Sequence, residues 1–90
     1  MKTIEYLIIE KIAHEVSDYV TYHGDGWSIY DGPSQTSRVW SLSECDGVIE
    51  LQYYGDEPEV QWSLTLEAAM PASVTADVIH AAINAQEAIR

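Results

Sequence analysis

The sequence predicts an α+β fold, a two-layer sandwich in which an N-terminal and a C-terminal helix cover one face of a four-stranded antiparallel sheet. Apolar residues recur at helical spacing near both ends of the chain, whereas apolar and polar residues alternate through its middle. Turn-forming residues separate the alternating segments, which predicts a meander and the element order α-β-β-β-β-α. A chain of 90 residues has the length of a single domain, here residues 1–90.

Residues 4–22 are predicted to form the first helix. Thr3 is a suitable N-cap, and Glu5 falls in the first turn, where the helix dipole favours a carboxylate. Gly24 can adopt the left-handed conformation that ends a helix. The β-branched residues within 4–9 would also allow a short strand there, but the apolar spacing continues through the whole segment and favours a helix. The apolar residues on one arc are Ile4, Ile8, Ile12, Val16, Tyr19 and Val20.

The middle of the chain is predicted to form four short strands with one apolar and one polar face. The turn-rich segments 31–37, 45–47 and 55–59 lie between them. Antiparallel strands with this alternation bury one face and leave the other in solvent. The inward residues are Trp27 and Ile29, Trp40 and Leu42, Ile49, Leu51 and Tyr53, then Val60, Trp62, Leu64 and Leu66.

The last segment is predicted to form a second amphipathic helix. Pro71 and Ser73 mark its start, with Ser73 as the N-cap and Asp77 in the first turn. Small apolar residues on one stripe would allow close packing against a neighbour: Val74, Val78, Ala81, Ala82, Ala85, Ala88 and Ile89. The opposite, polar face carries Asp77, His80, Asn84 and Glu87.

The charge balance excludes several classes of function. Four Lys and Arg residues stand against fifteen Asp and Glu residues, which gives a formal net charge of −11. A protein that binds nucleic acid by neutralising phosphates needs clustered basic residues instead. An apolar content of 47% excludes a disordered acidic tail, and the longest apolar run, residues 6–9, is far shorter than the ~20 residues of a bilayer span. We expect a globular protein that binds neither nucleic acid nor a membrane directly.

The cysteine content and the N-terminal residues bear on the compartment. The single cysteine, Cys45, leaves no internal disulfide and predicts a reducing environment. Glu5 and Glu10 interrupt the apolar stretch that a secretion signal needs, so the N-terminus is interpreted as mature sequence. The expected compartment is the cytoplasm, or the host cytoplasm if a phage encodes the chain.

No pattern indicates catalysis, a metal site or a cofactor. Residues 23–26, HGDG, lack a second histidine or cysteine at ligand spacing, and His14 and His80 fall on polar helix faces. Cys45 has an acidic residue on either side, which disfavours a reactive thiolate. Motifs that cradle phosphates or mark hydrolases are missing from the sequence. The three tryptophans are expected to form a core cluster rather than a ligand-binding box: Trp27, Trp40 and Trp62.

Acidic residues concentrate at both ends of the predicted sheet, because alternate loops of a meander lie at the same end. One end is expected to collect Asp31, Asp56, Glu57 and Glu59, and the other Asp25, Glu44, Asp46 and Glu67. This charge either serves solubility alone or presents carboxylates to a basic groove. For the second interpretation the predicted partner-binding residues are Glu44, Asp46, Asp56, Glu57 and Glu59, with Tyr30 and Tyr54 as aromatic contacts.

The polar face of the sheet is predicted to be almost uncharged, with Glu50 as the exception. Tyrosines and small hydroxyl residues are typical of adaptable recognition surfaces, although an ordinary solvent-facing sheet also carries them. The face is therefore a candidate for pairing two copies of the chain or for docking a partner. Its residues are Ser28, Tyr30, Ser41, Ser43, Gln52, Tyr54, Gln61, Ser63 and Thr65.

Together these features predict a small binding protein rather than an enzyme. The leading hypothesis is an inhibitor that blocks a basic nucleic-acid-handling protein in the manner of a DNA mimic. By analogy of size and charge only, phage counter-defence proteins of the anti-CRISPR or anti-restriction type and nuclease immunity proteins act in this way. The alternative is a non-enzymatic structural or adaptor subunit that associates, with itself or a partner, through the uncharged sheet face. A third hypothesis is an enzyme that uses His23 and Asp25.

Overall fold

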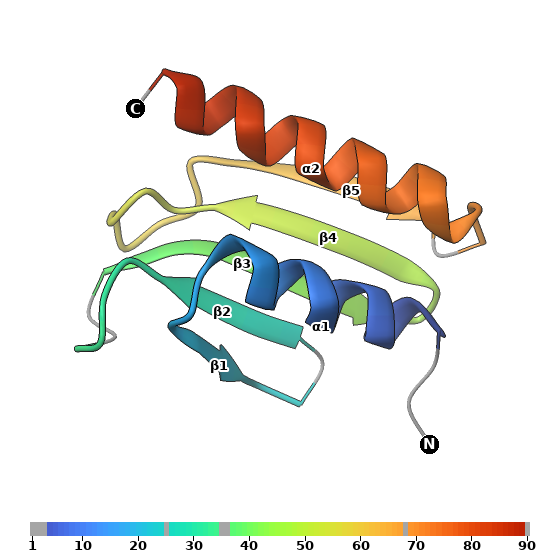
Figure 1. Cartoon of the computed structure of the whole chain (residues 1–90), viewed down its shortest axis with the longest axis horizontal. Helices are drawn as coiled ribbons and strands as arrows, with labels where there is room; N and C mark the ends of the chain where they lie inside the picture. The colour runs from blue at the N-terminus through green and yellow to red at the C-terminus, as the bar shows by residue number, and fades with distance from the viewer. Residues whose placement is uncertain (1–3, 25, 35–36, 68, 90) are drawn as a thin grey trace.

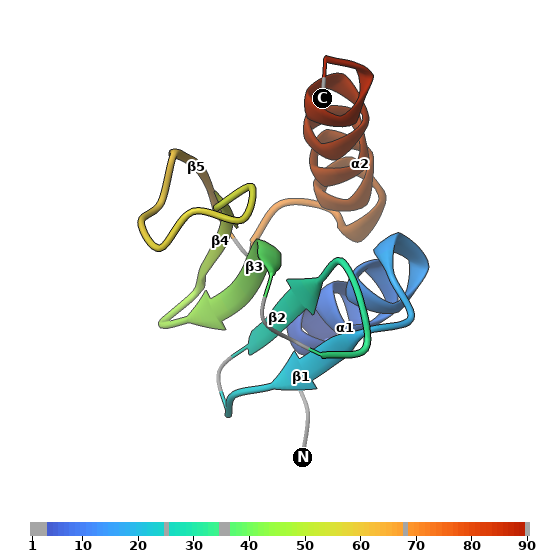
Figure 2. The ribbon, with the colours of Figure 1, turned by 90° about the vertical axis from the view of Figure 1, so that its left-hand side faces the viewer.

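The computed structural model of the chain describes residues 4–24, 26–34, 37–67 and 69–89 (Figure 1). It is an α+β sandwich, as predicted: one antiparallel sheet with a helix before it and a helix after it in the sequence. Both helices cover the same face of the sheet and run in the same direction (Figures 1 and 2). The elements are α1 (Ile4–Val16), β1 (Val20–Tyr22), β2 (Gly26–Tyr30), β3 (Arg38–Cys45), β4 (Val48–Tyr53), β5 (Trp62–Glu67) and α2 (Ala72–Ala88).

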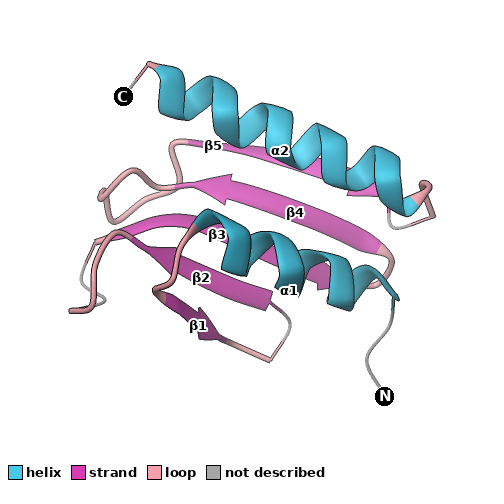
Figure 3. Ribbon diagram, viewed as in Figure 1, coloured by secondary structure: helices cyan, strands magenta, loops and turns pink. Residues whose placement is uncertain are grey.

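The sheet has five strands in the order β1-β2-β3-β4-β5, one more than the sequence predicted (Figure 3). Its register places apolar residues in rows beneath the helices: Leu42 lies opposite Trp27 and Leu51, and Leu51 lies opposite Leu64. These rows meet the buried side chains of both helices. The core consists of Ile9, Ile12, Ala13, Ile29, Val39, Trp40, Leu42, Ile49, Leu51, Ile79 and Ile83.

The extra strand comes from the segment predicted to complete the first helix. The helix ends at Val16, and the Ser17 hydroxyl accepts a hydrogen bond from the Tyr19 N–H (3.0 Å) while it donates one to the Tyr30 carbonyl (2.9 Å). Residues 20–22, which are β-branched or aromatic, then pair with residues 27–29. Gly24 has a φ of +81° in the turn after β1, so it does not end the helix. The prediction of a helix rather than a strand over residues 4–9 is confirmed, and the Thr3 cap lies outside the described residues.

The buried face of α2 differs from the predicted stripe. The helix buries Thr75, Ile79 and Ile83, whereas Val74 is 42% exposed and Ile89 is 79% exposed. The predicted stripe was built mostly on alanines, which bury little area, and the packed helix places its larger isoleucines in the core instead. The Ser73 cap is also wrong, because the helix follows Pro71, has no side-chain cap and has no acidic residue in its first turn.

Two of the three tryptophans pack together. The Trp40 ring lies 4.7 Å from Tyr53 and 5.6 Å from Trp62, centroid to centroid. Trp27 is separate and contacts Tyr22 and the ring of His14, 5.0 Å away, so the predicted three-tryptophan cluster is only partly correct.

Two indole hydrogen bonds attach the end of α2 to the sheet. Trp40 Nε1 donates to Glu87 Oε1 at 3.2 Å, and Trp62 Nε1 donates to Gln86 Oε1 at 2.8 Å.

We expect Gly26→Ala to destabilise the fold by about 1–3 kcal/mol, the usual cost of forcing extra atoms into a packed site. A Cβ atom at Gly26 would contact the Leu42 carbonyl and lie 2.6 Å from the Ser43 Cα, so β2 and β3 would have to separate. Gly32→Ala is the matched control, because a Cβ there meets nothing within 4 Å. Urea denaturation followed by tryptophan fluorescence measures both variants, and equal midpoints for the two would contradict the expectation.

Candidate functional site

Seven of the fifteen acidic residues gather at the end of the sandwich where both helices finish (left in Figure 1). The meander brings the β2–β3 and β4–β5 connections to this end, and the Trp40–Glu87 hydrogen bond ties the last turn of α2 to it. Among the described residues, the basic side chains beside it are those of Lys11, Arg38 and His80. We call this surface the acidic end; it comprises Glu15, Asp18, Asp31, Asp56, Glu57, Glu59 and Glu87.

The helices add to the negative potential of the acidic end. α1 ends at Val16 and α2 ends at Ala88, so the C-terminal, partly negative ends of both helix dipoles lie there. The last turn of α2 contains no basic residue that would offset its dipole. Dipoles and carboxylates therefore favour a positively charged ligand at the same place.

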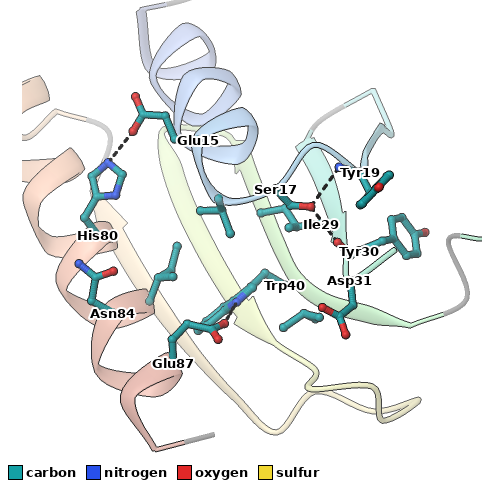
Figure 4. Close-up of a pocket in the computed structure, with 13 residues that line it drawn as sticks. Glu15, Ser17, Tyr19, Ile29, Tyr30, Asp31, Trp40, His80, Asn84 and Glu87 are labelled. Atoms are coloured by element: carbon teal, nitrogen blue, oxygen red, sulfur yellow. Dashed lines mark hydrogen bonds and ion pairs between the residues drawn. The ribbon is translucent and has the colours of Figure 1, made fainter. Parts of the chain in front are cut away.

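A cleft of about 450 Å³ opens between α1, α2 and the sheet at the acidic end (Figure 4). This volume is within the ~300–1,000 Å³ typical of ligand sites. Carboxylates reach it from three elements or their ends: Glu15 from α1, Asp31 after β2 and Glu87 from α2. Its buried apolar lining is Ile29, Val39, Trp40 and Ile83, and the half-buried or exposed residues around these are Val16, Ser17, Tyr19, Tyr30, His80 and Asn84.

Polar contacts between elements hold the walls of the cleft. The Glu15 carboxylate lies 3.2 Å from His80 Nε2, which links α1 to α2 (Figure 4), and 3.9 Å from Lys11 Nζ. Glu87 accepts the Trp40 indole N–H, and Ser17 holds the backbone at Tyr30. These links order the cleft before any ligand arrives.

The structure brings together only some of the predicted partner-binding residues. Asp56, Glu57 and Glu59 are exposed in the β4–β5 connection at the acidic end, and Tyr30 is half-buried at the edge of the cleft. Glu44, by contrast, lies near the end of β3, and Asp46 lies in the turn that follows, at the opposite end of the sheet.

Tyr54, predicted to be an aromatic contact on the polar face, is buried, and its hydroxyl donates to Oε1 of Gln52, a residue of the polar rows, at 3.4 Å. Its side chain is 9% exposed, and the Arg38 guanidinium lies over its ring, 3.8 Å from the centroid. Its backbone N–H donates to the Val39 carbonyl at 2.7 Å, just after the end of β4. Tyr54 therefore has little aromatic surface to offer a partner.

Sequence reasoning missed the helical contributions to the site. Glu87 was placed on a polar helix face and Glu15 was not singled out, since only loops were assigned to the ends of the sheet. The signal that could have found them is helix direction: two helices that cross the sheet in the same sense finish at the same end. Trp40 was predicted to be in the core, and it also lines the cleft.

The open face of the sheet carries the predicted polar rows. Ser28 pairs with Ser41, and Ser41 pairs with Gln52, which lies opposite Ser63. Ser28 itself is 1% exposed, and its hydroxyl lies 2.6 Å from Nε2 of the His23 ring. A depression of about 310 Å³ on this face is lined by His23, Gly26, Trp27, Ser28, Arg38, Ser41, Ser43, Glu50 and Gln52.

Other features of the described residues leave the acidic end as the main candidate site. Within these residues, His, Cys, Asp and Glu side chains form no group of three or more that could hold a metal ion. The described helices lack the length and hydropathy of a membrane span. Cys45 is exposed, and Asp25 lies outside the described residues. Comparison of the chain with protein-family models, curated proteins and solved structures finds no match.

Proposed function

We propose that the chain is a small acidic inhibitor that binds the basic groove of a nucleic-acid-handling protein through its acidic end. The observation that supports this proposal is the convergence of seven carboxylates and two helix C-termini on one surface with few basic side chains. Such a surface is complementary to the clustered Lys and Arg residues that a protein uses to hold phosphates. Phage counter-defence proteins and nuclease immunity proteins are the classes of inhibitor that this action matches.

The positions of the carboxylates suit competition with a polyanion. Asp56, Glu57 and Glu59 are exposed on one connection, while Glu15 and Glu87 extend the charge across the ends of the helices. Complementary charge raises association rates to as much as ~10⁸–10⁹ M⁻¹s⁻¹ at low salt, so the inhibitor reaches the groove quickly. Once bound, it excludes nucleic acid by occupying the same basic side chains.

A second candidate function, an adaptor subunit, is supported by the low charge of the open sheet face. Glu50 is the one carboxylate on the polar rows that pair across β2–β5, in a chain with a net charge of −11. On this alternative the acidic end serves only to keep the protein dispersed. Ser63→Arg, an exposed change on the open face, would then abolish association and leave the acidic end intact.

Affinity capture tests the proposal against the alternative. The tagged chain is incubated with a lysate of the cells in which it acts, with and without nuclease and at two salt concentrations. The proposal predicts that the chain captures a basic nucleic-acid-binding protein even after nuclease treatment. Salt and added duplex DNA should release this protein, and the chain should prevent it from binding DNA. The proposal would be overturned in favour of the adaptor if the chain bound a partner regardless of salt, or bound only itself, and if Ser63→Arg abolished that association.

A further inference from the structure

We propose that the cleft between α1, α2 and the sheet is a guanidinium-binding site. The identification of this guanidinium with an arginine side chain of the basic partner rests on the proposed function. The cleft has room for such a side chain, with a volume of about 450 Å³, and it opens at the acidic end, where a basic partner would dock.

The charges around the cleft favour a cation. Glu15, Asp31 and Glu87 line it together with a single basic side chain, His80, which already contacts Glu15. The C-terminal turn of α1 also lines it through Val16, so the carbonyl end of that helix dipole faces the same space. This potential would oppose an anion and would give a neutral ligand no net attraction.

The lining favours a guanidinium over an ammonium group. The cleft combines buried Ile29, Val39 and Trp40 with the residues Tyr19 and Tyr30. A guanidinium is planar and weakly hydrated, so it stacks on aromatic and apolar surfaces at a lower desolvation cost than a compact, strongly hydrated ammonium. The same contact occurs within this chain at a different site, where the Arg38 guanidinium lies 3.8 Å from the centre of the Tyr54 ring.

Asp31 and Glu87 are the carboxylates best placed to receive the ligand. Among the described residues, the Asp31 carboxylate makes no hydrogen bond or ion pair. Glu87 accepts the Trp40 indole N–H, which holds its carboxylate at the cleft. Carboxylates from two different elements fit a planar group with five donors, which binds such acceptors in a forked geometry.

Nuclear magnetic resonance provides a local reporter, because the Trp40 indole N–H bonds to Glu87 at the cleft. The ¹⁵N-labelled full chain is titrated with three probes of equal length: N-butylguanidinium, n-butylammonium and N-butylurea. We expect saturable shifts of the Trp40 indole signal with the guanidinium, binding about tenfold weaker with the ammonium, and none with the urea. Equal affinity for both cations, or equal binding of the neutral urea, would overturn the assignment.

Matched variants locate the binding. Asp31→Asn with Glu87→Gln removes two charges from the cleft but keeps an acceptor for Trp40, and we expect affinity for N-butylguanidinium to fall at least about tenfold. Asp46→Asn with Glu67→Gln removes the same charge from the opposite end and should change it less than about twofold. Equal losses in the two doubles would show a general field effect and reject the site.

A variant that fills the cleft distinguishes loss of the binding site from loss of the fold. Asn84→Tyr adds bulk at a lining position without changing charge, and it should abolish the Trp40 shifts while circular dichroism stays unchanged. Unaltered binding in Asn84→Tyr would contradict the proposal. Because the titration uses no protein partner, a positive result stands even if no basic protein is captured. A negative result leaves inhibition by the acidic end unaffected.

Discussion

Removing charge from the β4–β5 connection is expected to weaken binding to the basic partner by about 100-fold or more, because like charges placed against a basic groove cost several kcal/mol. The variant combines Asp56→Asn, Glu57→Lys and Glu59→Lys, which moves the formal net charge from −11 to −6. Asparagine is used at Asp56 because that residue has a φ of 74°, a left-handed conformation that asparagine tolerates and lysine does not. Association and dissociation rates measured against the captured partner give the effect.

A matched triple at or towards the opposite end separates local from overall charge. Asp46→Asn, Glu67→Lys and Asp77→Lys produce the same net charge of −6, and Asp46, with a φ of 54°, has the same backbone constraint as Asp56. We expect this triple to change the affinity by no more than about threefold, because charges more than a Debye length of ~8 Å from the contact are largely screened at physiological salt. If both triples weaken binding equally, the acidic end is not the binding surface.

The largest effect on folding is expected from Trp40→Ala, at about 3–5 kcal/mol, the usual cost of truncating a buried aromatic side chain. The side chain is 1% exposed, its ring contacts Tyr53 and Trp62, and its indole donates to Glu87. A domain of this size has a total stability of only about 5–13 kcal/mol, so much of the margin would be lost. Urea denaturation followed by circular dichroism measures the change.

The control for this truncation is Ile89→Ala. Ile89 is 79% exposed just after the end of α2, so its removal should leave the denaturation midpoint unchanged. The slope of the transition should be the same for both variants if each unfolds in two states. A loss below about 1 kcal/mol for Trp40→Ala would contradict the packing described for the core.

The sheet could be predicted from the sequence because its pattern is strictly local. Alternation through Ile49, Leu51 and Tyr53 selects one face of a strand regardless of the rest of the fold. The strand formed by residues 20–22 could not be predicted, because Val20 also continues the helical spacing of α1. The segment forms a strand only through its pairing with β2. The buried face of α2 was misassigned for a related reason: alanines tolerate either face, and the sheet's shape selects Ile79 and Ile83.

The candidate site was predictable only in its loops. Meander topology alone brings Asp31 and Asp56 to one end, whatever the details of packing. The cleft depends instead on how far apart α1 and α2 lie on the sheet, which no periodicity reports. For that reason Glu15 and Glu87 were not assigned to the site, although both are visible in the sequence as polar helix residues.

The central claim is that the chain and nucleic acid compete for one basic groove, and a competition titration tests it most directly. The purified partner is titrated with the chain at several fixed concentrations of duplex DNA. The claim predicts that the apparent dissociation constant of the chain rises in direct proportion to the DNA concentration, with no complex that contains all three components. An apparent affinity that does not change with DNA, or a stable ternary complex, would contradict it.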